Sequence, residues 1–302
     1  MSSHEILQNT IRKIEGAYAP STIRAYKSSF ERFIQLCEEC KASALPADPE
    51  DVALYISKLT KSGLKSSSIR IVVASISSIH KLNLLSDPTQ HPTVKLELRR
   101  MHRILGRSTK QALGITEPIL EKMLKVTDSN LRGVRDRVLL LLAYDSMCRR
   151  SELVSIRVED IQVSSEGHPT SMKILLRKSK TDQHGSGKWI HLSAETTQSL
   201  HQWLSTAKIN EGLIFRGVRS SGAITDGLCE SRISRIYKAL ARKAGLSEPL
   251  VQSISGHSMR VGGAQDLLNV GASLPQIMVK GGRSEEHTSE LQSRQYLVCR
   301  LL

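Results

Sequence analysis

Three short segments, far apart in the sequence, carry side chains suited to chemistry at a phosphate group. The first contains Arg149 and Glu152 in an R-x-x-E-L pattern. The second is the basic stretch RKSKT around Lys180, and the third pairs His257 with Arg260 in an H-x-x-R pattern. Each segment alone has an ordinary explanation: an ion pair within one helix face, solvated charges at a hairpin tip, or a polar helix start. One segment by itself is therefore weak evidence for a site.

Together, the three segments supply what metal-free chemistry at a phosphodiester requires. The guanidinium groups of Arg149 and Arg260 can hold the non-bridging oxygens and offset the charge that develops in the transition state. Lys180 can protonate the leaving oxygen, and His257 can donate or accept a proton. His257 and Arg260 should share a face at the start of a helix, where backbone N–H groups favour an anion. No carboxylate cluster suits magnesium, which argues against a two-metal nuclease.

The chain is long enough for two compact domains and is strongly basic, with 302 residues and a formal net charge of +14. So large a positive charge favours an anionic partner, and nucleic acid is the usual one. The sequence has no apolar run that could span a membrane, and its first residues, MSSHEILQNTIRK, lack the apolar region of a secretory signal. We therefore expect a protein that acts inside the cell, with DNA and not with a membrane.

The five cysteines are scattered and odd in number, which is typical of a reducing compartment. Cys37 and Cys40 form a CxxC pattern, but no second pair of ligands follows at a spacing that suits zinc. The surrounding segment is typical of a helix with Cys37 on its apolar face. We interpret the two cysteines as structural, and a metal or redox role is the alternative.

Apolar residues in the first hundred positions recur at spacings of three and four, which predicts a small bundle of four amphipathic helices. These helices cover residues 21–40, 48–62, 66–82 and 94–105. The fourth interleaves its apolar positions with arginines, namely Arg99, Arg100, Arg103 and Arg107. We expect residues 1–106 to form one domain and these arginines to contact DNA phosphates.

Residues 107–114 are polar, small and basic, as expected of a linker. A second domain is predicted over residues 115–282. Its patterns predict helices at 117–126, 135–144, 194–205, 229–244, 257–270 and 274–280, with a strand hairpin formed by 172–177 and 188–192. The predicted fold class is mainly α with a small antiparallel β-sheet.

The order of the three motifs resembles that of the tyrosine site-specific recombinase and integrase family, and in particular its Cre-like members. The resemblance is carried by AYDSMCRRSELVSIRVEDI, RKSKT and GHSMRVGGAQDLLNVGASLPQIMVKGG, within residues 115–282, and extends more loosely over 1–106. It implies a SAM-like core-binding domain followed by a DNA breaking-rejoining catalytic domain. It also implies DNA recombination or integration through a 3′-phosphotyrosyl intermediate, on duplex DNA, by a tetramer and without a cofactor.

The resemblance also implies roles for individual residues. Four positions match the catalytic set of the family and a fifth matches an acidic residue that supports it; these are Arg149, Lys180, His257, Arg260 and, as the acid, Glu152. Arg150 is the neighbouring competitor for the role of Arg149, and Lys178 is the competitor for the role of Lys180.

The resemblance ends at Gly282. The family continues with a Trp or His and, a short way further on, with the tyrosine that attacks the phosphate. Residues 283–302, RSEEHTSELQSRQYLVCRLL, instead resemble the translation of a short-read sequencing adapter. We therefore expect this tail to be non-native, and Tyr296 and His287 to have no role. The chain would then lack a nucleophile and bind DNA without cleaving it.

Two other interpretations stay open from the sequence. A DNA-binding protein without catalysis describes the chain if the tail is native. A type IB topoisomerase uses a similar set of residues to relax DNA without exchanging strands between partners. The separate helical bundle and the Cre-like context of the H-x-x-R motif favour the recombinase.

Overall fold

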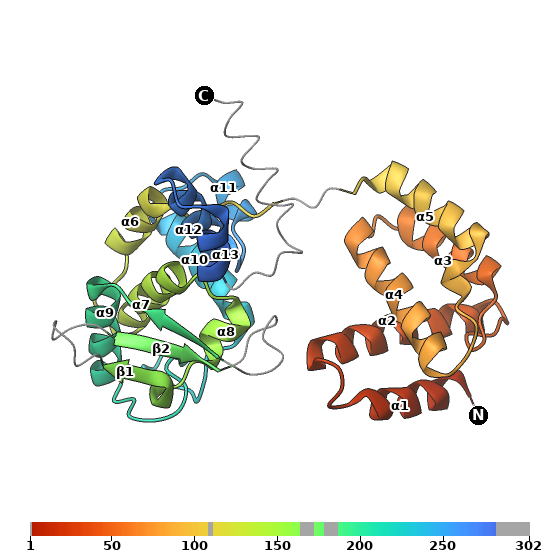
Figure 1. Cartoon of the computed structure of the whole chain (residues 1–302), viewed down its shortest axis with the longest axis horizontal. Helices are drawn as coiled ribbons and strands as arrows, with labels where there is room; N and C mark the ends of the chain where they lie inside the picture. Colours follow the sequence, from red (N-terminus) through yellow and green to blue (C-terminus); the bar gives the residue numbers. More distant parts are fainter. Residues whose placement is uncertain (1, 108–110, 164–171, 178–186, 282–302) are drawn as a thin grey trace. The chain divides into compact units, whose positions relative to one another are not determined.

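The computed structural model describes residues 2–107, 111–163, 172–177 and 187–281. The polypeptide divides into two compact units, Met1–Lys110 and Gln111–Leu302, each with its own hydrophobic core (Figure 1). The predicted fold class, mainly helical with one small antiparallel sheet, is confirmed. In the part of the chain that the structure describes, no helix is long and apolar enough to cross a membrane.

The first unit is a bundle of helices. Its elements are α1 (Ser3–Ile14), α2 (Pro20–Glu39), α3 (Pro49–Lys61), α4 (Ser66–Leu82), the 3-10 helix η1 (Pro88–Gln90) and α5 (Pro92–Leu105). The four predicted helices are present as α2 to α5, and α1, which was not predicted, precedes them. Ser2 caps α1, because its Oγ accepts the Glu5 N–H at 3.2 Å and its own N–H donates to the Glu5 carboxylate at 2.8 Å.

Helix α3 begins where the sequence predicts an N-terminus. Asp48 accepts the N–H of Glu50 at 2.9 Å, and Pro49 fills the first helical position, where an N–H has no partner within the helix. The core of this unit includes Phe30, Phe33, Ile34, Ile56, Ile69, Ile76 and Ile79. Cys37 is buried in the same core, and burial raises the pKa of its thiol to about 12, so it packs as a neutral apolar side chain.

The second unit consists of helices and a three-stranded antiparallel sheet. Its helices are α6 (Glu117–Lys125), α7 (Leu131–Ser146), α8 (Arg150–Ser155), the 3-10 helix η2 (Val158–Asp160), α9 (Ala194–Thr206), α10 (Glu230–Lys243), α11 (Glu248–Ser253), α12 (Ser258–Asn269) and α13 (Leu274–Gly281). Its strands are β1 (Ile161–Val163), β2 (Met172–Leu176) and β3 (Lys188–His191), in that order across the sheet. β2 and β3 are the predicted antiparallel pair, with Ile174 opposite Ile190.

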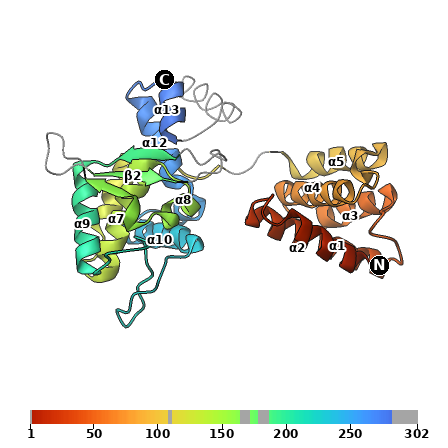
Figure 2. The ribbon, with the colours of Figure 1, turned by 60° about the horizontal axis from the view of Figure 1, so that its bottom comes forward.

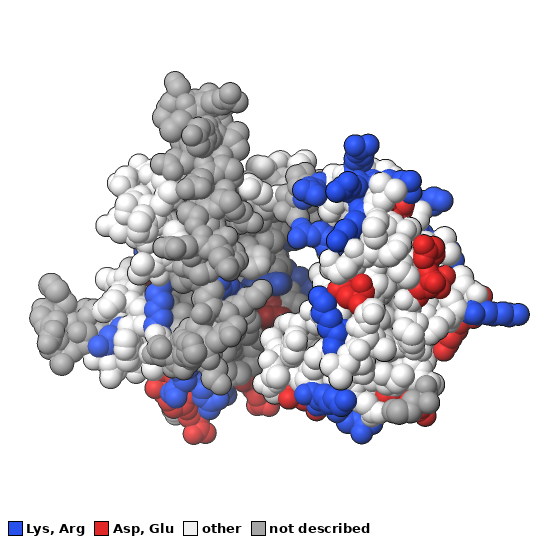
Figure 3. Space-filling model, turned by 45° about the vertical axis from the view of Figure 1, so that its right-hand side comes forward, with Lys and Arg blue, Asp and Glu red and all other residues white. Residues whose placement is uncertain are grey.

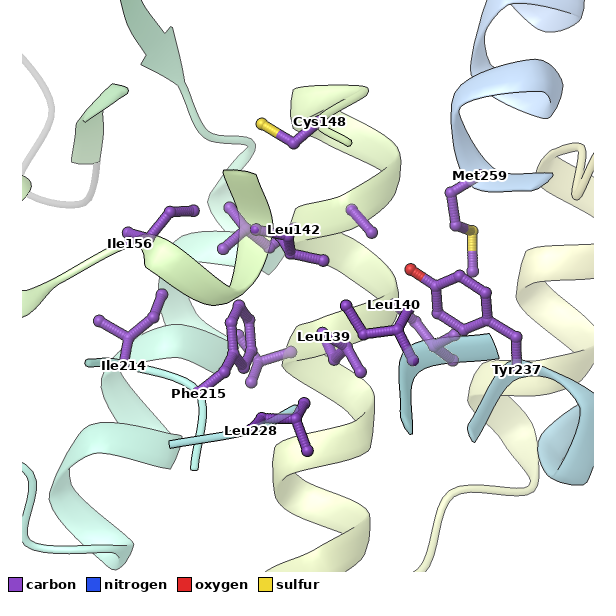
Figure 4. Packing of buried hydrophobic residues seen from close by; sticks show 14 of the residues in the cluster. Leu139, Leu140, Leu142, Cys148, Ile156, Ile214, Phe215, Leu228, Tyr237 and Met259 are labelled. Atoms are coloured by element: carbon purple, nitrogen blue, oxygen red, sulfur yellow. The ribbon is translucent and has the colours of Figure 1, made fainter. Parts of the chain in front are cut away.

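Helix α7 lies at the centre of the second unit, in contact with both α9 and α12 (Figures 1 and 2). Every residue from Val138 to Ala143 is buried, and a helix that is apolar on all sides must be covered on all sides. Figure 4 shows Leu139, Leu140 and Leu142 of α7 within this core, with Met259 of α12 pointing towards the ring of Tyr237 on α10. The core thus fixes α12, the helix that begins beside His257, against α7 and α10.

Candidate active site

Arg149 and Glu152 form the first part of the site, at the start of α8. Glu152 accepts two hydrogen bonds from Arg149, one from the backbone N–H and one from Nη1, each at 2.7 Å. Only 18% of the Arg149 side chain and 7% of the Glu152 side chain are exposed. The predicted ion pair is confirmed. The prediction that both residues lie on one helix face is wrong, because Arg149 is the N-cap residue and α8 begins at Arg150. The extended backbone of Arg149 lets its N–H reach the Glu152 carboxylate as well.

Arg260 lies in the first turn of α12 and is 6% exposed. Its Nη1 donates to the carbonyl oxygen of Met147 at 2.9 Å. Met147 ends α7 with a φ of 50°, in the left-handed region, and its carbonyl is among those that a helix end leaves without an intrahelical partner. Because Met147 is only two residues before Arg149, both predicted arginines are held at the turn between α7 and α8.

His257 is the N-cap residue of α12 and is exposed, whereas Arg260 is buried. The prediction that the two share a helix face is therefore wrong: His257 precedes the helix, and the two side chains differ in their access to solvent. Serine hydroxyls hold the turn that carries His257. The His257 N–H donates to Ser255 Oγ at 3.1 Å, and the Ser255 N–H donates to Ser258 Oγ at 2.9 Å.

Two glycines allow α12 to approach its neighbours closely. A side-chain carbon at Gly262 would overlap the carbonyl group of Ile115, and one at Gly263 would come within 3.3 Å of Cγ of Met147. The N–H of Ile115 also donates to the carbonyl oxygen of Ser258 at 2.9 Å. These contacts hold the helix that carries Arg260 against the end of α7 and against the segment that precedes α6.

Lys188, at the start of β3, interacts electrostatically with Arg260 and Glu152 and was not predicted as a site residue. Its Nζ donates to the carbonyl oxygens of Val279 and Lys280 at the end of α13, each at 2.6 Å. Burial lowers the pKa of Lys188, and nearby Arg260 lowers it further, whereas Cys148 and Glu152 oppose the shift. The Lys188 ammonium group thus interacts electrostatically with Arg260 and Glu152. The one signal in the sequence is a lysine at the edge of an apolar strand.

Several predicted features lie outside the described residues. These are Lys180, its competitor Lys178, part of the linker (residues 108–110), and the whole tail from Arg283 to Leu302 with His287 and Tyr296. Their predicted roles are therefore not tested by the structure. Among the side chains that the structure does describe, no three His, Cys, Asp or Glu residues come together as a metal ion would require.

The first unit carries a basic surface on α5. The four predicted arginines are all exposed: Arg99, Arg100 and Arg103 lie on α5, and Arg107 follows it. Figure 3 shows Lys and Arg side chains gathered at the end of this unit where α5 lies. The surface continues onto α4. The pKa of His102 is lowered by burial and also by the positive charges of Arg107 and Arg70. Arg70 was not predicted, because only the arginines of α5 stand out as a run in the sequence.

Comparison with known proteins identifies the family. The chain matches the model of the Phage integrase family over residues 115–291, and the model of the Phage integrase N-terminal SAM-like domain over residues 12–84. It is 29% identical over 297 residues to an integrase/recombinase XerD homolog of Selenomonas ruminantium, an alignment that covers 95% of this chain and 84% of the relative. It is 27% identical over 282 residues to the recombinase Cre of Escherichia phage P1, covering 88% of this chain and 81% of Cre.

Solved structures share the fold at low sequence identity. One is the Tn1549 transposon integrase in complex with circular intermediate DNA, with a TM-score of 0.64, 13% identity, and coverage of 93% of this chain and 92% of the other. Another is a lambda integrase dimer bound to a core site, with a TM-score of 0.64, 14% identity, and coverage of 96% and 77%. Because the first family model matches more than half of the chain, this protein belongs to the phage integrase family of tyrosine recombinases.

Proposed function

We propose that this protein takes part in site-specific DNA recombination, by cleaving and rejoining strands through a 3′-phosphotyrosyl link. The observation that carries the proposal is the convergence of Arg149 and Arg260 at one turn. Glu152 anchors the first guanidinium and the carbonyl of Met147 anchors the second. An arginine presents several N–H donors in a fixed fork that matches the oxygens of a phosphate, so the two guanidinium groups have the chemistry to bind one.

In this scheme, Arg149 and Arg260 bind the non-bridging oxygens of the scissile phosphate and offset its charge in the transition state. A tyrosine hydroxyl attacks the phosphorus, so a P–O bond to the tyrosine forms and the bond to the 5′ oxygen breaks. Lys180 gives the leaving 5′ oxygen a proton, and His257 accepts the proton that the tyrosine hydroxyl loses. Glu152 supports the site through Arg149. The scheme requires no metal ion and no nucleotide cofactor.

The substrate in this proposal is duplex DNA. Support comes from the net charge of +14, from the exposed arginines of α5, and from the DNA complexes of integrases with the same fold. Phosphate contacts by Arg99, Arg100, Arg103 and Arg107 would add affinity without reading the sequence. Binding should therefore weaken steeply as the salt concentration rises.

We further propose that residues 283–302 are translated adapter, so that the nucleophilic tyrosine is absent and Tyr296 does not replace it. The 302-residue chain then binds DNA as a monomer or weak associate, without forming the tetramer of the family. It positions a phosphate but cannot form the covalent link.

Two assays test this function. In the first, duplex DNA is titrated with the chain by fluorescence anisotropy at several salt concentrations; absent or salt-insensitive binding would contradict DNA as the substrate. In the second, a duplex nicked near the scissile phosphate traps any covalent adduct. We expect no adduct from this chain. An adduct that disappears in Tyr296→Phe would overturn the adapter interpretation. Sequencing the gene past the codon for Gly282 should reveal a Trp or His followed by a Tyr.

A further inference from the structure

Arg150 is the first residue of α8, and its contacts differ from those of Arg149. Its Nη1 lies 3.5 Å from Ser234 Oγ on α10. The stem of its side chain crosses Gly256, in the turn that precedes α12. A side-chain carbon built at Gly256 would overlap Cγ, Cδ and Nε of Arg150. Arg150 therefore fills the space that a side chain at position 256 would need.

The backbone of Gly256 does not itself require glycine. Gly256 is not among the described glycines with a positive φ, so an alanine could adopt its backbone conformation. Glycine is needed at this buried position because Arg150 passes over it. Gly262 differs, since a side chain there would meet the backbone of Ile115, which cannot move aside.

The guanidinium end of Arg150 faces α10. Burial, and to a lesser extent Cys148, raises the pKa of Tyr237, while the positive charge of Arg150 opposes that increase. The distance of 3.5 Å to Ser234 is at the long end for a hydrogen bond. Packing of the stem over Gly256 is therefore the stronger of the two contacts, and the guanidinium adds an anchor on α10.

The turn that Arg150 covers is the turn that presents His257. Because His257 is exposed, its place depends on the turn and not on burial of its own side chain. We propose that Arg150 is a positioning residue: its stem ties this turn to the start of α8, and so sets His257 beside the phosphate that Arg149 binds. The role of His257 at a phosphate rests on the proposed function, whereas the tie between Arg150 and the turn does not.

The test compares Arg150→Ala, Arg150→Lys, Gly256→Ala and the double variant Arg150→Ala with Gly256→Ala in the 302-residue chain. Arg235→Ala is the matched control, since it removes a neighbouring exposed arginine of α10. The readouts are the NMR shifts of the His257 imidazole at fixed pH and hydrogen exchange of the His257 and Ser258 amides. Thermal unfolding shows whether each variant folds.

We expect R150A to move the imidazole shifts and to speed exchange about tenfold, as for loss of one tertiary contact. R150K, which keeps the stem, should restore both. G256A should act like R150A because its methyl group displaces the stem. The double variant should then be no worse than either single variant, since both changes break one contact. R235A should leave both readouts unchanged.

Unchanged shifts and exchange in R150A, or additive effects in the double variant, would overturn the proposal. If one of the two single variants fails to fold, the other still decides the question, because R150A removes the stem and G256A displaces it. Unchanged shifts in the variant that folds would overturn the proposal. DNA affinity is measured separately. R150A and H257A should weaken binding to the same degree, and the variant that combines them should bind no more weakly than either. The effects of R235A and H257A should instead be additive. If the chain binds no DNA at all, the proposed function is contradicted. The NMR shifts and amide exchange then still test whether Arg150 positions the turn.

Discussion

Removing the Glu152 carboxylate should destabilise the second unit substantially. Glu152→Ala deletes the acceptor of two charge-assisted hydrogen bonds from Arg149, and it leaves a guanidinium that is only 18% exposed without that partner. Hydrogen bonds to charged groups each contribute about 1.5–3 kcal/mol. Loss of one partner of a buried ion pair costs roughly 3–5 kcal/mol. Because Arg149 can turn partly towards solvent, we expect a loss of about 2–4 kcal/mol in the free energy of unfolding.

Urea unfolding measures this loss in the unit that contains the mutation. The two tryptophans of the chain, Trp189 and Trp203, both belong to the second unit, so their fluorescence reports on that unit alone. With a slope of about 2 kcal/mol per molar urea, the midpoint of unfolding should fall by roughly 1–2 M. Glu152→Gln, which keeps one acceptor oxygen and the shape of the side chain, should lie between the parent and the alanine variant.

The matched control is Glu195→Ala. Glu195 pairs with Arg137 at 2.6 Å, but 55% and 36% of their side chains are exposed. An exposed ion pair contributes at most about 1 kcal/mol. If E152A shifts the midpoint no more than E195A does, burial of the Arg149–Glu152 pair does not have the energetic importance that we assign to it.

Three further outcomes are expected. Lys188→Met should speed amide exchange in the last turn of α13 about tenfold, because it removes two hydrogen bonds, whereas K173M on the neighbouring strand should not. Burial raises the pKa of Asp87, but its hydrogen bonds lower it by more, to well below the usual range. Its carboxylate thus stabilises the fold above a pH of about 3.9, and this contribution is lost as pH falls through the lowered pKa. Urea unfolding followed by circular dichroism at pH 5 and pH 3 should therefore show a smaller acid loss in D87N. Arg103→Ala should weaken binding to all duplexes and reduce the salt slope by about one, and R100A should do less because a carboxylate already pairs with Arg100.

Long helices with caps and a continuous apolar face were predicted closely. α4 covers Ser66–Leu82, the predicted range, and α3 starts directly after the Asp48 cap. α7 starts four residues before its predicted position. Its cap is Asn130, whose side chain accepts the N–H of Gly133 at 3.0 Å, and the apolar run that suggested the helix begins later. Helix boundaries thus follow the cap and not the first apolar residue.

What the sequence did not predict depends on partners that are distant along the chain. Spacing alone placed Arg149 inside a helix, because arginine gives no signal of an N-cap position. The ammonium group of Lys188 is held by carbonyl groups at the end of α13. The side chain of Arg150 can pass over position 256, before α12, because that residue is a glycine. β1 has only three residues, Ile161–Val163, too few for an alternating pattern to be recognised. Such contacts appear only once the fold brings the segments together.

The chain that enters the second unit pairs with the segment around the start of α12 before it reaches any other part of the core. The N–H of Leu113 donates to the carbonyl of Ser253 and the N–H of Ile115 donates to that of Ser258, each at 2.9 Å. A force applied to the chain at Gln111 would therefore load these two backbone hydrogen bonds before the rest of the core. Because Ser258 begins the helix that holds Arg260, such a load would act directly on the alignment of that guanidinium.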